Sequence, residues 1–350
     1  MAIDIGALVQ EHYGIIAAKC ISTREGWIIE EEGTGRSFLC RQSQLRGEKI
    51  IGTYIMLEHL ESNGFDKTDK YITCLNGLPF IQGNSANFTL IFRKNGTECD
   101  ISDSNDIASA SVLLAQMHLA AEGFTADAAK DRLIKYHDML SEDEDEQFNF
   151  SSYMKNDLGK TQSVFKKRFE ELKRFRKTAK RSNNAFDYAY LEVADYYCSL
   201  AETISQALED SPYQIITDEY SKRGCICHRD YTGHNILLNE NESIINFESA
   251  CIDLPIYDVA NFIRRRMRKC GWSSKDAYYI LENYSKVRPI SDDELSVLKL
   301  LLQFPQKLWR IINKYYNSRR SWCEKSCLAK LEEVKQEREP LEEFAIQFLT

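Results

Sequence analysis

The first ninety residues place hydrophobic side chains in short runs, several of which alternate with polar positions. Turn-forming segments with glycine separate the first three runs, at residues 23–26 and 33–35. Such spacing predicts the strands of an antiparallel meander. A separate stretch, residues 51–60, repeats its apolar positions at helical spacing until Asn63-Gly64 ends it, which predicts one helix within this region. The predicted strands are residues 15–21, 27–31, 37–41, 71–74 and 88–92.

The pattern changes after Asn95-Gly96, where long amphipathic segments begin. These segments predict the helices 107–121, 130–140, 161–180, 188–208, 276–284, 292–316 and 323–348. The predicted fold class is therefore α+β. We expect a small antiparallel β lobe with one helix over residues 1–94, a hinge at about 91–99, and a large, mainly helical lobe over residues 95–350, with a ligand cleft between them.

Composition excludes few classes of protein. The chain has 350 residues, 43% of them hydrophobic, enough for two cores. We expect production in a cytosol, because no secretory signal and no apolar run of about 18 residues is found. Membrane insertion is not expected. A net charge of −8 disfavours a nucleic-acid partner, and the 11 scattered cysteines favour reduced, mostly buried thiols.

The most informative stretch is residues 228–238, which begins His228-Arg229-Asp230 and includes Asn235. An Asp followed five residues later by an Asn, in a loop entered through His and closed by an apolar strand, is typical of a kinase catalytic loop. Asp230 is the candidate catalytic residue that orients a hydroxyl, and Asn235 is a candidate metal ligand through its amide oxygen. His228 is expected to support the loop by packing and hydrogen bonding. The overall plan is thus that of a protein-kinase-like bilobal fold.

The same stretch, together with residues 245–265, resembles the aminoglycoside phosphotransferase and choline kinase-like superfamily. Within it, the Asp-Leu-Pro-x-x-Asp run at residues 253–258 and the hinge at 96–100 resemble the CotS family of spore-coat-associated proteins. Further support comes from the C-terminal segment containing Phe304-Pro305, Trp309, Tyr315-Tyr316 and Trp322. The resemblance implies ATP and Mg²⁺ as cofactors and spore coat proteins as partners. It also implies a small hydroxyl-bearing acceptor, and a location in the mother-cell cytoplasm followed by the coat.

Carried over by position, the resemblance gives Asp230 the catalytic role, Asn235 a metal-binding role, and Asp258 the role of bracing the loop. Asn246 is the second candidate metal ligand but departs from the pattern, since the family has a metal-binding Asp there. Losing a unit charge about 4 Å from a cation costs about 4 kcal/mol at an effective dielectric constant of about 20. Glu248, two residues on, is expected on the same side if the segment is a strand. It either replaces the missing carboxylate or faces a solvent-side cation.

The small lobe departs in a similar way. Arg41 stands where the superfamily has a phosphate-pairing Lys, and Glu58 in the following helix is the expected ion-pair partner. A planar guanidinium does not reproduce the geometry of an ammonium. These changes weaken the case for ATP and Mg²⁺. They favour a catalytically impaired pseudokinase or nucleotide-binding coat component. An active ATP-dependent phosphotransferase and a purely structural coat protein are the alternatives.

Overall fold

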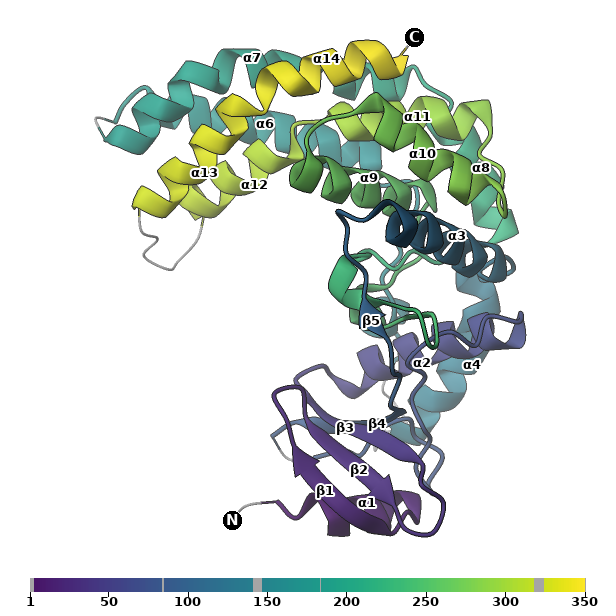
Figure 1. The fold of residues 1–350 in the computed structure, drawn as a ribbon. Coiled ribbons are helices and arrows are strands. Elements are labelled where there is room, and N and C mark those ends of the chain that lie inside the picture. The colour runs from purple at the N-terminus through teal and green to yellow at the C-terminus, as the bar shows by residue number, and fades with distance from the viewer. Residues whose placement is uncertain (1–2, 84, 141–146, 183, 318–323, 350) are drawn as a thin grey trace. The chain divides into compact units, whose positions relative to one another are not determined.

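The computed structural model describes residues 3–83, 85–140, 147–182, 184–317 and 324–349. Trp322 lies outside these ranges. The chain divides into two compact units, each treated separately below. The first comprises residues 1–156, 220–258 and 282–289, and the second comprises residues 157–219, 259–281 and 290–350 (Figure 1). The first unit therefore includes both the predicted β lobe and the 228–235 loop.

A four-stranded antiparallel sheet forms the N-terminal part of the first unit, in the order β1-β2-β3-β4. Its strands are β1 (Ala17–Ser22), β2 (Trp27–Glu31), β3 (Ser37–Ser43) and β4 (Asn87–Phe92). These confirm the predicted meander. Residues 71–74 were predicted as a strand, which is wrong: Tyr71 makes only an isolated bridge to Ile91. Helix α1 (Ile5–Tyr13), which the pattern did not predict, buries Ile5, Val9 and Tyr13 in the core cluster on one face of the sheet.

The first unit also contains further helices and a second, smaller sheet. Helix α2 (Gly47–Ser62) confirms the predicted helix, and α3 (Ser104–Ala120), α4 (Ala126–Leu140) and α5 (Phe150–Tyr153) follow it. The small sheet has the order β5-β6-β7, formed by β5 (Thr97–Glu98), β6 (Ile236–Leu238) and β7 (Ser243–Ile244). It joins the predicted hinge to the strands around the 228–235 loop. Short 3₁₀ turns, η1 (Gly233–Asn235) and η2 (Phe247–Ser249), complete the loops.

The second unit is helical throughout its described residues. Its helices are α6 (Thr161–Ala179), α7 (Ala185–Glu209), α11 (Asp292–Gln303), α12 (Gln306–Asn317), α13 (Glu324–Gln336) and α14 (Arg338–Leu349). Three further helices, α8 (Tyr213–Arg223), α9 (Ile256–Cys270) and α10 (Ser274–Ser285), have residues in both units. Stacked rings hold the core, with centroids 3.8 Å apart for Phe165 and Phe304 and 3.7 Å apart for Phe186 and Tyr315.

Two predicted long helices were wrong in length. Residues 292–316 form two helices because Pro305 lacks the N–H that would continue α11. Residues 323–348 likewise divide at Glu337. There Pro340 sits in the first turn of α14, where no intrahelical N–H bond is needed. Within the described residues no helix is long and apolar enough to cross a lipid bilayer. The mixed architecture, with a small antiparallel sheet and many helices, confirms the predicted fold class.

Candidate nucleotide and phosphoryl-transfer site

The face of the sheet opposite α1 lines a cavity of about 950 Å³ in the first unit. Successive strand residues point to opposite faces, so Phe38 and Cys40 enter the core cluster with α1 while Leu39 and Arg41 line the cavity. Pairing of β3 with β4 sets Ile91 opposite Leu39. The Arg41 side chain therefore points into the cavity because of the alternation along β3.

The cavity combines apolar surfaces with cations. Its lining includes the apolar residues Ile28, Leu39, Ile91, Leu237 and Ile245, the cations Arg24, Arg41, Arg93 and Lys94, and the carboxylates Glu25, Asp69, Glu98 and Glu240. The loop residues Asn235 and Asn246 also line it. Ligand pockets in proteins typically measure about 300–1,000 Å³. Apolar side chains suit a planar base, and guanidinium groups suit phosphate oxygens.

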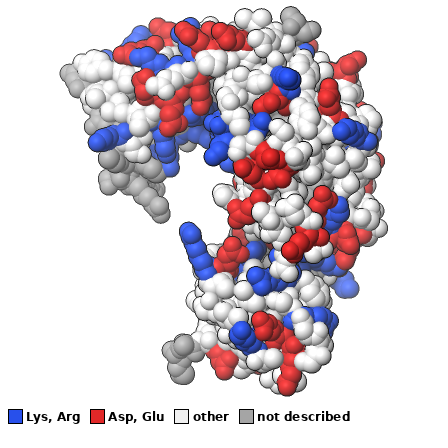
Figure 2. All heavy atoms as spheres, viewed as in Figure 1, with Lys and Arg blue, Asp and Glu red and all other residues white. Residues whose placement is uncertain are grey.

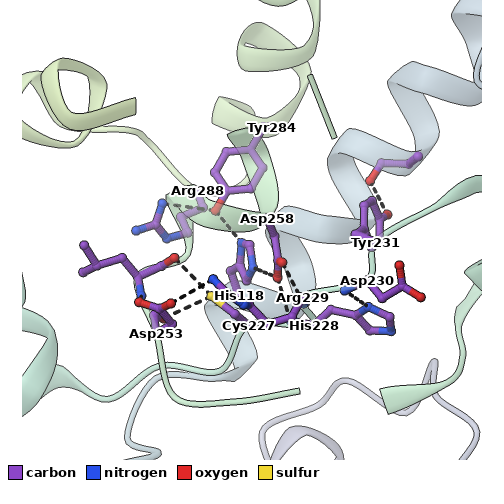
Figure 3. Close-up of polar contacts among 12 residues, drawn as sticks. His118, Cys227, His228, Arg229, Asp230, Tyr231, Asp253, Asp258, Tyr284 and Arg288 are labelled. Atoms are coloured by element: carbon purple, nitrogen blue, oxygen red, sulfur yellow. Dashed lines mark hydrogen bonds and ion pairs between the residues drawn. The ribbon is translucent and has the colours of Figure 1, made fainter. Parts of the chain in front are cut away.

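Near the start of the 228–235 loop, Arg229 has a strained backbone conformation. Arg229 adopts a left-handed conformation with φ of 67°, which residues other than glycine seldom adopt. The buried carboxylate of Asp258 holds this turn by accepting the backbone N–H groups of His228 at 2.6 Å and Arg229 at 2.8 Å (Figure 3). This is the contact expected of a residue that braces the loop. Arg229 also donates to Asp253 at 2.9 Å, and that carboxylate raises its pKa against the opposing effect of burial.

Asp258 is in turn positioned by a series of side-chain contacts that begins with His118 on α3. His118 Nε2 lies 3.3 Å from the Asp258 carboxylate, and His118 Nδ1 lies 2.8 Å from the Tyr284 hydroxyl, which accepts from Arg288 at 3.1 Å. Figure 3 shows His118 between these two partners. Burial alone would raise the pKa of Asp258, but the hydrogen bond and positive charge of His118 lower it. The sequence did not reveal this contact.

His228 supports the loop from inside. Its ring is fully buried, with Nε2 donating to the carbonyl of Ile245 at 2.9 Å and Nδ1 accepting the N–H of Asp230 at 3.3 Å. Burial lowers the pKa of His228, which favours the neutral ring. The ring meets Phe247 edge-on at 4.7 Å. These contacts fit the supporting role expected for His228.

The structure brings Asp230 and Asn235 together as the loop pattern requires. The Asn235 amide nitrogen donates to the backbone carbonyl of Asp230 at 2.8 Å and to its carboxylate at 3.1 Å. Gly233 makes this turn possible, because a Cβ there would lie 2.5 Å from the carbonyl oxygen of Cys99. Asp230 is thus oriented by Asn235.

Asn246 connects this loop to the sheet. Its Oδ1 accepts from Arg41 Nη1 at 2.8 Å, and its Nδ2 donates to Asn235 Oδ1 at 2.7 Å. A continuous chain of hydrogen bonds therefore runs from Arg41 through Asn246 and Asn235 to Asp230. Both amide oxygens that were expected to bind a metal already accept hydrogen bonds from protein groups.

The expectation for Glu248 rested on strand alternation, and the local structure is different. Asn246 is left-handed, with φ of 63°, and residues 247–249 form the 3₁₀ turn η2. Alternation therefore does not apply. Glu248 is exposed and is not among the residues that line the cavity, although its charge contributes to raising the pKa of Asp69.

The expected ion pair of Arg41 with Glu58 is wrong. Glu58 instead contacts Arg132, accepts from the Tyr54 hydroxyl at 2.6 Å and lies 3.7 Å from Lys70. Tyr54 lies on α2, Arg132 on α4 and Lys70 in the segment after α2. The carboxylate nearest to Arg41 belongs to Asp69, 3.4 Å away.

Asp69 is a site residue that the sequence did not identify. Its side chain is 4% exposed, and Oδ2 accepts the backbone N–H of Asn246 at 3.0 Å. Burial raises its pKa to about 6, although the Asn246 N–H and the Arg41 charge act in the opposite direction. No local motif marks Asp69. It reaches the site through a bridge between Thr68 and Ile244, residues far apart in the sequence.

The donor set fits a divalent cation poorly. Mg²⁺ prefers several hard oxygen ligands, including carboxylates. Here the two amide oxygens are neutral and each accepts a hydrogen bond, the Asp230 carboxylate accepts from Asn235, and the Asp69 carboxylate faces a guanidinium. A cation bound here would compete with Arg41 and with the amide of Asn246 for these oxygens.

Comparison with known proteins identifies the family. Residues 132–348, more than half of the chain, match the family model described as "Spore coat putative kinase YutH". The chain belongs to this family. Two relatives of this YutH-family chain come from Bacillus subtilis (strain 168). Spore coat protein S is 22% identical over 306 residues, covering 86% of this chain and 80% of the relative. Endospore coat-associated protein YutH is 27% identical over 172 residues, covering 47% of this chain and 48% of the relative.

Solved structures similar to the YutH-family chain share its fold. An aminoglycoside phosphotransferase from Alicyclobacillus acidocaldarius is 20% identical with a TM-score of 0.78, and the match covers 99% of this chain and 96% of that one. Spectinomycin phosphotransferase, solved with ADP and spectinomycin, is 14% identical with a TM-score of 0.62, covering 98% and 97%. The likeness to these two structures concerns the fold. The predicted resemblance to spore-coat-associated proteins of the CotS type is confirmed by the family model and by the relatives.

Proposed function

We propose that this YutH-family chain is a nucleotide-binding, kinase-like component of the spore coat whose phosphoryl transfer is impaired. The names of its two Bacillus relatives, a spore coat protein and an endospore coat-associated protein, support deposition on the coat. Synthesis in the mother-cell cytoplasm, followed by contact with other coat proteins, is part of this proposal. A small hydroxyl-bearing acceptor belongs only to the active alternative.

Nucleotide binding is supported by the cavity. A base fits between the sheet residues Ile28 and Leu39 and the loop-side residue Leu237, with the phosphates directed toward Arg41. Stacking on aliphatic side chains and charge-assisted hydrogen bonds to a guanidinium both stabilise such a ligand. Spectinomycin phosphotransferase, which has a similar fold, was solved with ADP, and this supports a nucleotide as the ligand.

The observation that carries the impairment is the hydrogen-bond chain through Asn246. In an active enzyme of this design, a bound Mg²⁺ would neutralise charge on the transferred phosphate. Here Arg41 donates to Asn246 Oδ1 at 2.8 Å, and Asn246 donates to Asn235 Oδ1 at 2.7 Å. The amide groups that would bind the cation instead form hydrogen bonds with each other and with Arg41. Nucleotide phosphates are therefore bound mainly by cationic side chains.

Thermal unfolding with ATP, titrated with and without Mg²⁺, tests the proposal. Binding to the folded state raises the melting temperature with ligand concentration. We expect ATP to stabilise the protein to a similar extent with Mg²⁺ and with a chelator, and we expect no phosphate release. The Arg41→Ala variant should lose this stabilisation, whereas Arg36→Ala, in the turn before β3 and paired with Glu31 outside the cavity, should retain it.

An active phosphotransferase is the second candidate, favoured by the intact contact of 3.1 Å between Asn235 and the Asp230 carboxylate. It predicts Mg²⁺-dependent turnover with an alcohol acceptor. Measurable turnover would contradict the proposed impairment. Absence of any ATP effect on unfolding would contradict nucleotide binding and leave a structural coat protein.

A further inference from the structure

Helix α6, in the second unit, carries a line of positive charge. Its buried residues Phe165, Phe169, Leu172 and Phe175 face the core. The opposite side presents the basic strip, defined as the exposed residues Lys166, Lys167, Arg174, Lys177, Lys180 and Arg181. The exposed Glu170 lies on the same side and pairs with Lys173. The last two follow directly after the helix. At 1.5 Å per residue, the strip is about 22 Å long from residue 166 to residue 181.

Helix α7 carries the opposite charge. It has no Lys, Arg or His in its 25 residues. The exposed residues Glu192, Asp195, Glu202 and Glu209 form the acidic strip. Spacings of three, seven and seven residues keep these carboxylates on one side of the helix. The strip extends over about 26 Å, close to the length of the basic strip.

Internal ion pairs use only part of this charge. Arg176 of α6 pairs with Asp195 of α7 where the two helices pack together, and Glu192 accepts from Lys335 at 2.6 Å. Over the described residues, the side chains of Lys166, Lys177, Glu202 and Glu209 make no hydrogen bond or ion pair. Two strips of similar length and opposite charge thus lie on neighbouring helices, and several of their charged side chains have no partner within the described part of the chain.

We propose that these strips form an interface between two copies of this chain, with the basic strip of α6 against the acidic strip of α7 of the second copy. A surface with a positive half beside a negative half is complementary to itself after a two-fold rotation, so both strips of each copy are used at once. Cyclic two-fold pairing is the commonest symmetry of homo-oligomers. The inference is independent of the nucleotide site, since all these residues belong to the second unit.

A second copy fits this surface better than a generic anionic partner. A uniformly anionic polymer would be attracted to α6 but repelled by α7 and by the net charge of −8. Figure 2 shows Lys and Arg side chains next to Asp and Glu side chains on the face in view, rather than a face of one sign. Each exposed ion pair contributes little on its own, so the contact depends on the whole set and weakens with salt.

Charge exchange between variants tests the interface. One variant carries Lys166→Glu and Lys177→Glu, and the other carries Glu202→Lys and Glu209→Lys. Both pairs of positions are exposed and lack internal partners. Lys269→Glu combined with Lys275→Glu, on exposed residues of the same unit outside both strips, is the matched control. The mass of the full chain in solution is measured by sedimentation at about 0.05 M and about 1 M salt, where screening lengths are roughly 14 Å and 3 Å.

We expect the unmodified chain and the control to be dimers at low salt and monomers at high salt. Each strip variant alone should be monomeric at low salt, with at least a tenfold weaker self-association. An equimolar mixture of the two strip variants should again give dimers, because the unchanged acidic strip of the first variant meets the unchanged basic strip of the second, and the introduced carboxylates on α6 meet the introduced ammonium groups on α7. A wild-type chain that is monomeric at low salt would overturn the inference. A mixture that stays monomeric, or strip variants that dimerise like the control, would do the same.

Discussion

The amide oxygen of Asn246 accepts a hydrogen bond of 2.8 Å from the guanidinium Nη1 of Arg41. The sequence presented two separate departures from the kinase pattern, one in the sheet and one after the 228–235 loop. In the structure the two residues concerned, Arg41 and Asn246, contact each other. An amide at position 246 can accept from Arg41 and donate to Asn235 at the same time, which a carboxylate cannot do. The two departures are therefore mutually compatible, and reversing one of them disturbs the other.

Asn246→Asp should restore a Mg²⁺-dependent component of ATP binding. The substitution adds a charge at the expected metal position and removes the N–H group that occupies Asn235 Oδ1. We expect the apparent affinity for ATP with Mg²⁺ to increase at least about tenfold, which is about 1.4 kcal/mol. Thermal-shift titrations of each variant against its own ligand-free melting temperature measure this change.

Asn241→Asp is the control for that experiment, since it adds the same charge at an exposed position that does not line the cavity. It should leave the Mg²⁺ dependence unchanged. Equal behaviour of the two variants would mean that the missing charge at position 246 does not limit metal binding.

Asp69→Asn should strengthen ATP binding in the absence of Mg²⁺. The Asp69 carboxylate lies 3.4 Å from Arg41 and competes with phosphate for its positive charge. An Asn side chain keeps nearly the same shape and an oxygen for the Asn246 N–H, but it removes the competing charge. We expect about a threefold to tenfold lower dissociation constant for ATP in a chelator, measured by calorimetry.

Asp66→Asn makes the same chemical change on an exposed side chain three residues away. Its affinity for ATP should equal that of the unmodified chain. If Asp69→Asn weakened binding in the chelator, Asp69 would be holding Arg41 in place for the phosphate instead of competing with it.

Glu58→Gln should leave nucleotide binding within about twofold of the unmodified chain. The Glu58 carboxylate contacts Arg132, Tyr54 and Lys70, not Arg41. We expect only a small change in the melting temperature, because surface ion pairs contribute about 0–1 kcal/mol. ATP titrations compare this variant with Arg41→Ala. A loss as large as that of Arg41→Ala would restore the original expectation that Glu58 supports the phosphate site.

Local patterns in the sequence predicted the elements that depend on local chemistry. Alternation located β2 and β3, and the Asp230 and Asn235 spacing located the loop. Long-range contacts were harder to predict. Asp69 reaches Arg41 only because the 67–69 segment bridges to Ile244, and His118 reaches Asp258 across 140 positions. Position 248 was misjudged because β7 ends at Ile244 and the backbone of Asn246 is left-handed. Apolar spacing cannot show such a change in backbone conformation.

Asp258→Asn should destabilise the first unit strongly, in a way that depends on pH. The Asp258 carboxylate is fully buried and accepts two backbone N–H groups, whereas an amide offers only one oxygen and would set its NH₂ group against an N–H donor. We expect a loss of about 2–4 kcal/mol in the free energy of unfolding at pH 7. Asp138→Asn, on an exposed face of α4, should cost close to nothing.

The pH dependence of this loss follows from the pKa of Asp258, which His118 lowers although burial would raise it. A carboxyl with a lowered pKa in the folded state stabilises the protein fully above its unfolded pKa of about 3.9, and this stabilisation disappears as the pH falls through the folded value. The difference between the unmodified chain and Asp258→Asn should therefore be constant at about pH 5–7 and shrink below about pH 4. Urea unfolding at several pH values measures it. A difference that stays the same down to pH 3 would show that the charge on Asp258 does not stabilise the loop.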